Sequence, residues 1–397
     1  MLDTKGPEIR TGILRDSEPL ELKEGQELDV LTDFSLEGDP RRITISFQAL
    51  PETVKVGDKI IIDDGQLTLE VKECLEDLVK VNVMNDHVLG EHKNVILPGC
   101  QIDLPVLTER DEMDIIDFGF KENIDILAWS FTRKESDIEK ISEFLGEDKR
   151  KNIKIFAKIE WKESLDNYEG LLRAADGVII CRGDLAREIP PEKVFLAQKW
   201  MISEANAAGK PVIVSTEILE SMINKFRPSR AEAGDIADAI LQGVDCIMLT
   251  RETSIGKYPI NATKMLAKIC WEAEKINNYR NVYEEIWATS LTPFSFSETV
   301  ASSIANTALD LKIGLLIVFT ETGKAANILA KYRPRQPIFV CAASQSVRKQ
   351  MNSVRGVIPF AINPGESKDD CIKRVISYWK ERGFCSERSK AIVQTTW

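Results

Sequence analysis

Five short apolar runs between residues 124 and 252 each end in a polar or charged side chain. In chain order they read IDILAWS, IKIFAKIE, GVIICRGD, PVIVST and CIMLTRE. Each run has the length and the largely β-branched composition of a buried strand, and helical segments lie between the runs. The alternation predicts a parallel sheet with helices on its faces, as in a (β/α) barrel.

Two other regions have a different hydrophobic rhythm. From 12 to 105, short alternating runs are separated by turn residues, which predicts a small inserted all-β domain. From 276 to 397, helices alternate with the runs GLLIVFT, PIFVCA and AIVQTTW, which predicts a second, C-terminal α/β layered domain. We therefore expect the catalytic barrel domain to comprise 1–11 and 106–275.

The number of barrel strands is lower than in a closed barrel. The five runs and one strand before Gly6 give six, whereas a (β/α)8 TIM barrel has eight. We expect either an open barrel that lacks its first strands or a chain that is N-terminally truncated relative to its type. Because an open sheet exposes apolar edges, we also expect low stability for this chain.

Composition narrows the class of protein. The net charge of −11 argues against a nucleic-acid partner but leaves room for a local basic pocket. The N-terminus lacks a basic-then-apolar signal, and every apolar run is too short to span a membrane, so we expect a cytoplasmic protein. Eight cysteines lie scattered without CxxC pairs beside only two histidines, which favours reduced thiols over a zinc site.

Charged residues at neighbouring strand ends carry the candidate chemistry. Glu160 and Asp184 follow adjacent strands, and Mg²⁺ prefers one or two protein carboxylates together with substrate oxygens. Lys158 lies two residues before Glu160, so both side chains point the same way from a strand. A lysine facing a barrel interior is costly unless it is paired or working, and there it suits a transferring phosphoryl group. Either carboxylate alone is as easily a salt-bridge partner.

Three more positions extend this set. Gly183-Asp184 forms a strand-to-helix turn at which backbone N–H groups are free to meet an anion. Thr216 ends its run before a helix, so its hydroxyl is either an N-cap or a group that positions substrate and passes a proton. Ser130 and Glu252 end the first and the last run.

The motifs together resemble those of the pyruvate kinase family, in order and over essentially the whole chain. They are LDTKGPEIRTG (2–12), IDDG (62–65), LPG…DLP (97–105), SFTRK (130–134), KIE (158–160), RGDL-x-x-EIP-x-EKVFLAQK (182–199), LESMI…RPSRAE (219–232) and IML-x-x-ET (247–253). The resemblance implies a barrel with an inserted β lid and a C-terminal α/β regulatory domain. It also implies phosphoryl transfer from phosphoenolpyruvate to ADP, giving pyruvate and ATP in glycolysis.

The resemblance further implies roles for individual residues. Lys158 would meet the transferring phosphoryl group, Glu160 and Asp184 would hold Mg²⁺ or Mn²⁺, and Thr216 would assist protonation. The remaining implied contacts are Ser130, Gly183 and Asp184 with substrate, Arg10 and Lys93 with nucleotide phosphates, and Asp3 and Thr4 with K⁺.

The resemblance also implies partners and regulation. The family forms homotetramers, and its members often bind a sugar-phosphate effector. The loop 320–324 matches the effector loop, in which Thr320, Thr322, Gly323 and Lys324 would surround a phosphate. Glu321 places a negative charge beside that phosphate and argues against such activation.

Departures from the family pattern leave alternatives. The usual Ser-Gly-Glu-Thr is Thr250-Arg251-Glu252-Thr253 here, and Trp161, Ala186 and Glu217 also differ. The second hypothesis is therefore a truncated or non-catalytic regulatory or scaffolding chain, and for this chain we expect turnover far below that of the family. A third, another barrel enzyme acting on phosphoenolpyruvate or an oxoacid, leaves the lid and the C-terminal domain unexplained.

Overall fold

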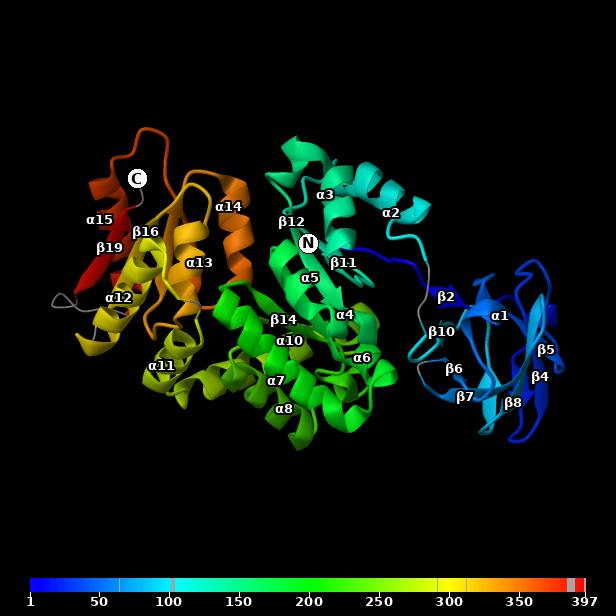
Figure 1. Ribbon diagram of the computed structural model, residues 1–397. Coiled ribbons are helices and arrows are strands. Elements are labelled where there is room, and N and C mark those ends of the chain that lie inside the picture. Colours follow the sequence, from blue (N-terminus) through cyan, green and yellow to red (C-terminus); the bar gives the residue numbers. More distant parts are fainter. Residues whose placement is uncertain (64, 101–103, 291, 312, 384–389, 396–397) are drawn as a thin grey trace.

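The fold consists of three units in a row. The structure, a computed structural model, describes residues 1–397 except 64, 101–103, 291, 312, 384–389 and 396–397. Figure 1 shows α/β layers at the left, a helix-covered parallel sheet in the centre and a β-rich unit at the right. Each unit has hydrophobic clusters of its own.

The central sheet has six parallel strands whose spatial order follows the chain. They are β1 (Leu2–Asp3), β11 (Ile126–Trp129), β12 (Lys154–Ile159), β13 (Gly177–Cys181), β14 (Val212–Ser215) and β15 (Cys246–Met248). Among the described residues, β1 and β15 pair with one neighbour each, so the sheet is an open half-barrel. The expectation of six barrel strands, with one before Gly6, is confirmed.

Helices cover one face of this sheet and connect its strands. In chain order they are α2 (Glu109–Met113), the π-helix η2 (Asp114–Gly119), α3 (Glu135–Arg150), α4 (Lys162–Asp166), α5 (Tyr168–Ala174), α6 (Arg182–Glu188), α7 (Pro191–Ala208), the 3₁₀ turn η3 (Glu220–Ile223), α8 (Arg230–Gln242), α9 (Arg251–Ser254) and α10 (Pro259–Lys275). The next helix, α11 (Tyr279–Thr289), packs into the C-terminal cluster through Ile286. Ser229 caps α8 in a capping box with Glu232, and Gly209 ends α7 in the left-handed region at φ 67°.

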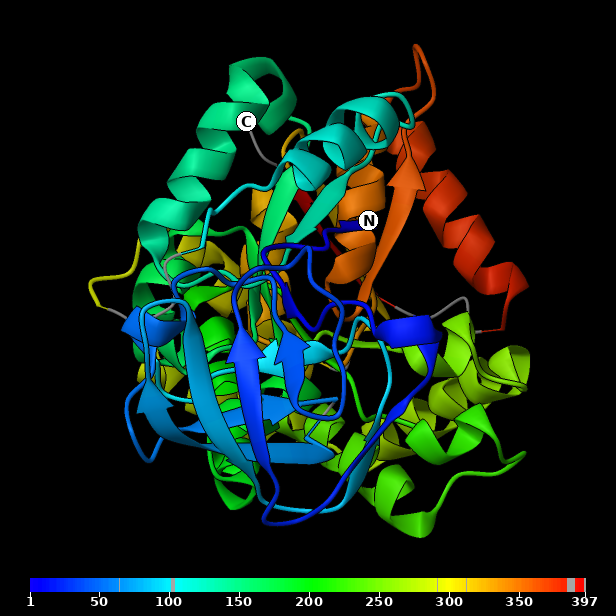
Figure 2. The same cartoon turned by 90° about the vertical axis from the view of Figure 1, so that its right-hand side faces the viewer.

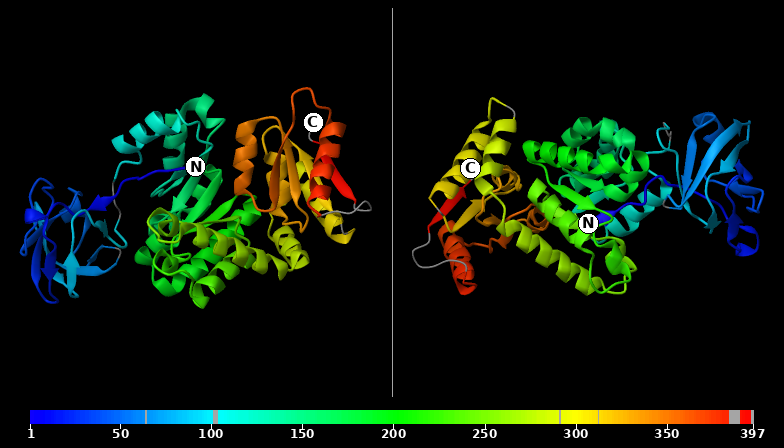
Figure 3. Two further views of the ribbon diagram at one scale, coloured as in Figure 1. Left: turned by 180° about the vertical axis from the view of Figure 1, so that it is seen from behind. Right: turned by 90° about the horizontal axis from the view of Figure 1, so that it is seen from below.

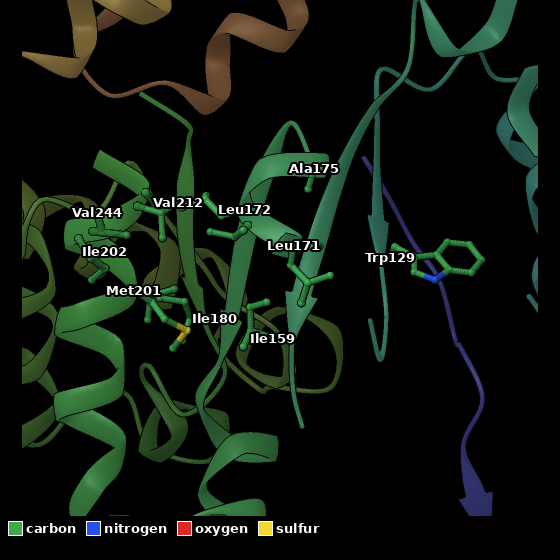
Figure 4. Close-up of a cluster of buried hydrophobic side chains, with 14 of the residues drawn as sticks. Trp129, Ile159, Leu171, Leu172, Ala175, Ile180, Met201, Ile202, Val212 and Val244 are labelled. Carbon is green, nitrogen blue, oxygen red and sulfur yellow. The ribbon is translucent and has the colours of Figure 1, made fainter. Parts of the chain in front are cut away.

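Successive side chains of a strand point to opposite faces of the sheet, and this decides which of them reach the inner face, away from the covering helices. Ile155 and Ile159 of β12 belong to the large core beneath the helices, whereas Phe156 belongs to a smaller cluster on the other face. Figure 4 shows Ile159 and Ile180 close to Met201 of α7 in the large core. Because side chains alternate in a strand, Lys158 shares the inner face with Phe156.

The β-rich unit holds a seven-stranded sheet and a two-stranded one. Its elements are β2 (Ile9–Arg10), η1 (Arg15–Ser17), β3 (Leu20–Leu22), β4 (Glu27–Leu31), β5 (Arg42–Thr44), α1 (Leu50–Thr53), β6 (Lys59–Ile62), β7 (Leu67–Cys74), β8 (Leu78–Val83), β9 (His87–Leu89) and β10 (Asn94–Ile96). Figure 2 shows this lid unit facing the viewer, in front of the central sheet. β2 pairs with β10, so Arg10 already belongs to the lid sheet.

The C-terminal unit is a four-stranded parallel sheet in the order β18-β17-β16-β19. Its elements are α12 (Phe296–Asp310), β16 (Leu315–Phe319), α13 (Lys324–Lys331), β17 (Ile338–Ala342), α14 (Gln345–Gln350), η4 (Met351–Ser353), β18 (Val357–Ala361), α15 (Lys368–Glu381) and β19 (Ala391–Thr395). The predicted last run AIVQTTW thus forms β19, and its residues 396–397 lie outside the described part.

A junction of polar contacts joins the C-terminal unit to the amino ends of the barrel strands. Nε2 of Gln350 donates to the carbonyl oxygens of Asp125, at 3.3 Å, and of Asn152, at 2.8 Å. These carbonyls lie just before β11 and β12. Nη1 of Arg333 lies 2.6 Å from Oδ1 of Asp245, the residue before β15. Figure 3 shows the two units meeting at this end of the sheet from both further directions.

The structure also bears on the expectations for the cysteines and for membrane-spanning helices. Seven cysteines are free thiols, and Cys385 lies outside the described residues. Within the described part of the chain, the helices are all too short or too polar to cross a bilayer.

Candidate active site

Four side chains from three adjacent strands meet at the carboxyl end of the central sheet. Nζ of Lys158 lies 3.0 Å from Oδ1 of Asp3 and 3.0 Å from Oε1 of Glu160, and it donates to Oγ of Ser130 at 2.8 Å. Oγ of Ser130 in turn donates to the backbone oxygen of Thr4 at 2.6 Å. The structure therefore brings together residues that the sequence placed on separate runs.

The charges in this group are tightly coupled. Burial by itself lowers the pKa of Lys158, but the nearby carboxylates, Glu160 above all and then Asp3, outweigh it and hold the pKa well above the ordinary value. Glu160 is only 3% exposed, and one of its oxygens accepts the N–H of Phe131. Lys158 is therefore a permanent cation beside a buried carboxylate.

Glu160 and Asp184 lie close enough to share a metal ion. Each offers an oxygen, Cys181 offers a sulfur, and these three atoms all lie within 4.8 Å of one another. Burial, and then the charge of Glu160, raises the pKa of the Cys181 thiol far above its usual range, so the free thiol is protonated and uncharged. The two carboxylates fit a hard divalent cation that takes oxygen ligands.

Thr216 occupies a strained turn against Gly183. Its φ of 63° lies in the left-handed region, which β-branched residues rarely adopt, and Glu217 follows at 52°. Oγ1 of Thr216 accepts the N–H of Gly183 at 2.7 Å and donates to the Ser215 carbonyl at 2.7 Å. A Cβ on Gly183 would lie 3.3 Å from that hydroxyl, so the close approach favours glycine.

A buried arginine holds this turn in place. Arg182 donates through its guanidinium to the carbonyl oxygens of Thr216 and Glu217, and its Nη1 lies 2.6 Å from Oδ2 of Asp235. The side chain is 9% exposed. The strained backbone is thus fixed by an ion-paired anchor behind it, as expected where local strain serves a site.

Two cavities open onto these residues. The first, the lysine cavity, has a volume of about 670 Å³ and is lined by Asp3, Ser130, Lys158, Glu160 and Asp184, among others. The second, the lid cavity, has a volume of about 1050 Å³ and lies between the lid unit and the central unit. Glu8 and Asp184 line both, so the two spaces meet at these two carboxylates.

Both predicted phosphate-binding cations line the lid cavity. Arg10 donates to Oε2 of Glu8 at 2.8 Å and to the backbone oxygen of His92 at 2.7 Å. Nζ of Lys93 lies 2.9 Å from Oδ1 of Asp63. Thr216 and Gly183 line the same cavity from the opposite side. Cations on the lid thus face the strained turn of the central unit.

The sequence did not single out several residues of this site. Cys181 joins the carboxylate pair, and Nη1 of Arg187 lies 3.2 Å from Oδ1 of Asp184. Glu252, by contrast, lines neither cavity: it is fully buried and accepts the N–H groups of Leu219 and Thr250. The only signal for Arg187 was its place one helical turn after Asp184.

The predicted effector loop, residues 320–324, follows β16 at its carboxyl end. Oγ1 of Thr320 accepts the N–H of Gly323 at 3.0 Å, and Gly323 has a φ of 83° where it begins α13. The N–H of Lys324 donates to Oγ1 of Thr322 at 3.4 Å. The loop is therefore a compact turn at the start of α13.

Comparisons of the sequence with protein families give two matches. The family described as "Pyruvate kinase, barrel domain" matches residues 1–263, and "Pyruvate kinase, alpha/beta domain" matches residues 298–397. A pyruvate kinase of Eimeria tenella is 45% identical over 98% of this chain and 73% of its own length. A cytosolic pyruvate kinase isozyme of Glycine max is 47% identical over 97% of this chain and 79% of its own length.

Solved structures agree with the sequence comparisons. A pyruvate kinase from Cryptosporidium parvum superposes with a TM-score of 0.93 and is 40% identical, covering 99% of this chain and 81% of that one. A structure of a pyruvate kinase from the same organism in complex with ADP superposes with a TM-score of 0.89 at 39% identity, over all of this chain and 80% of that one.

Proposed function

Because the chain belongs to the pyruvate kinase family, we propose that the residues around the lysine and lid cavities carry out its reaction. The enzyme transfers a phosphoryl group from phosphoenolpyruvate to ADP, giving pyruvate and ATP. The single observation that carries the assignment of the site is the contact of Lys158 with Asp3, Ser130 and Glu160 at the carboxyl ends of three strands.

We assign the electrostatic work to Lys158. Phosphoryl transfer spreads negative charge over the moving group, and a fixed cation in a partly buried site stabilises that charge. Lys158 meets this need because its pKa is held high and its side chain is only 12% exposed. Ser130 holds the ammonium group in position and lies beside the transferred phosphate.

Thr216 and Gly183 would handle the substrate. The Gly183-Asp184 turn at the start of α6 would receive the carboxylate of phosphoenolpyruvate, with the N–H of Gly183 held by Oγ1 of Thr216. As the phosphoryl group leaves the enol oxygen for a β-phosphate oxygen of ADP, the remaining enolate gains a proton at its terminal carbon. The hydroxyl of Thr216 is the group we assign to holding that proton in place.

Metals would bind where oxygen atoms converge. The family depends on a divalent metal, and we propose Mg²⁺ or Mn²⁺ at Glu160 and Asp184. When bound, such an ion neutralises phosphate oxygens and orients them. We assign K⁺ to Asp3 and Thr4, whose oxygens lie beside Lys158 and Ser130.

The organisation of the chain supports further proposals. We assign 1–11 and 106–275 to the catalytic domain, 12–105 to the lid and 276–397 to a regulatory domain, with β2 of the first segment paired into the lid sheet. The loop 320–324 would take the phosphate of a sugar-phosphate effector. Phe195, Leu196 and Trp200 on α7 are exposed apolar side chains, and we assign that face to contacts within a homotetramer. We expect the enzyme to work in cytoplasmic glycolysis.

The test is pyruvate formation from phosphoenolpyruvate and ADP, with Mg²⁺ and K⁺ present. We expect Lys158→Met to lower kcat by about 10³-fold or more. Lys154→Met is the matched control, because Lys154 lies on the same strand, at its other end, and pairs with Asp176 at 3.4 Å. Equal activity of the parent and the Lys158 variant would overturn the assignment.

A further inference from the structure

Four pairs of a cation and a carboxylate line the lid cavity. Besides Arg10 with Glu8 and Lys93 with Asp63, they are Arg187 with Asp184 and Arg251 with Glu220. Nη1 of Arg251 lies 3.1 Å from Oε1 of Glu220. Each cation is thus already present at the wall of the cavity, held by a carboxylate of the protein.

Arg251 is the most exposed of these four cations. Its side chain is 57% exposed, against 36% for Arg10, 37% for Lys93 and 19% for Arg187. An ion pair so exposed contributes little free energy, because water screens both charges. Glu220 therefore holds the guanidinium weakly, and a phosphate entering the cavity competes for it.

The backbone beneath Arg251 is firmly held. Glu252, the next residue, is fully buried, and its carboxylate accepts the N–H of Leu219 at 2.8 Å and that of Thr250 at 2.9 Å. These bonds tie the start of α9 to the segment that carries Glu220. Because the backbone at Arg251 is already held, only the side chain has to be ordered when the guanidinium binds a ligand, and less entropy is lost.

The carboxylates around Arg251 give a second explanation for this residue, namely charge neutralisation. Burial raises the pKa of Glu220, the charge of Arg251 lowers it, and Glu252 and Glu217 raise it again. Arg251 could therefore serve only to neutralise a crowd of carboxylates. That explanation accounts for the ion pair, but it does not account for a largely exposed guanidinium at the wall of a cavity shared with Arg10 and Lys93.

We propose that Arg251 is a nucleotide-affinity residue, which leaves Glu220 and binds the phosphates of the nucleoside diphosphate from the barrel side. Arg10 and Lys93 approach the same phosphates from the lid. Arginine suits this task because its planar fork forms paired hydrogen bonds to phosphate oxygens. The inference rests on the proposed placement of ADP in the lid cavity.

The test measures ADP binding to the protein by titration calorimetry with Mg²⁺ present. We expect Arg251→Ala to weaken ADP binding roughly tenfold, as for the loss of one partly exposed hydrogen bond to a charged group. The KM for phosphoenolpyruvate should stay within about twofold, because Arg251 does not line the lysine cavity. Arg173→Ala is the matched control, since Arg173 forms a similarly exposed pair with Glu135 outside both cavities.

Glu220→Gln provides the opposite perturbation. It removes the competing carboxylate and leaves the guanidinium, so ADP should bind about threefold more tightly, and the gain should shrink in the double variant that also lacks Arg251. A lower melting temperature of Arg251→Ala with unchanged ADP affinity would make Arg251 a structural neutraliser and overturn the proposal. If Arg10→Ala also left ADP affinity unchanged, the placement of the nucleotide would fail as well.

Discussion

The ammonium group of Lys158 lies 3.0 Å from the carboxylate of Glu160, two residues further along the same strand end. The pair sits on the inner face of the sheet, where Glu160 is 3% exposed. A buried ion pair is costly to break from one side, because the remaining charge has neither water nor a partner.

The first prediction concerns this pair. Lys158→Met leaves the Glu160 carboxylate without its cation, so we expect the free energy of unfolding to fall by about 3 kcal/mol. The double variant Lys158→Met/Glu160→Gln should recover most of that loss, because the neutral amide needs no counter-charge. Denaturant unfolding of both variants measures the difference. Equal stability of the single and the double variant would show that the pair is not coupled.

The second prediction separates strain from chemistry at Thr216. Thr216→Ala and Thr216→Gly both remove the hydroxyl, and both should lower kcat. Only glycine relaxes a φ of 63°, so the glycine variant should be more stable than the alanine variant by about 1 kcal/mol. Thermal unfolding of the two proteins is the measurement, and an alanine variant as stable as the glycine one would argue against backbone strain.

The third prediction compares two glycines in helices. A Cβ at Gly183 would lie 3.3 Å from Oγ1 of Thr216, whereas a Cβ at Gly234 of α8 would meet nothing within 4 Å. We expect Gly183→Ala to raise the KM for phosphoenolpyruvate by shifting the Thr216 turn. Gly234→Ala should leave kinetics unchanged and stabilise the protein by about 0.5 kcal/mol. Identical kinetics for the two variants would remove Gly183 from the substrate site.

The fourth prediction is a pH dependence that arises at Glu188. Burial raises the pKa of this carboxyl to about 7 from its ordinary value of 4.5, with Asp184 adding to the effect. The folded state therefore binds the proton more tightly than the unfolded state does. The resulting stabilisation is complete below about pH 4.5 and is lost as the pH rises through about 7.

Glu188→Gln removes this loss, because the amide does not titrate. Relative to the parent, the variant should gain on the order of 2 kcal/mol in free energy of unfolding between pH 5 and pH 8. Urea unfolding across that range gives both curves. Parallel curves would mean that Glu188 titrates normally in the folded protein.

Much of the fold and site followed from local pattern. The apolar runs predicted five of the six strands of the central sheet, because a strand buried on both faces must be apolar throughout, and the segment before Gly6 supplied the sixth, β1. The i, i+2 spacing put Lys158 beside Glu160, as the structure has them. The helix ends at Ser229, which caps α8, and Gly209, which ends α7, likewise depend on local residue types.

The remaining features depend on contacts between distant segments. The thiol of Cys181 reaches the carboxylate pair only because β12 and β13 are neighbours in register. Glu252 looked like another strand-end acid, but its carboxylate turns inward to two backbone N–H groups. The exposed pair of Arg251 and Glu220 joins two turns, and a sequence pattern does not show which turns meet.

The junction made by Gln350 has a mechanical consequence. The side-chain amide of Gln350 donates hydrogen bonds to backbone carbonyls just before β11 and β12, and the carboxyl ends of these strands carry Ser130 and Lys158. Gln350 thus ties α14 to the same two strands that position the ammonium group of Lys158, and the two attachments lie at opposite ends of the sheet.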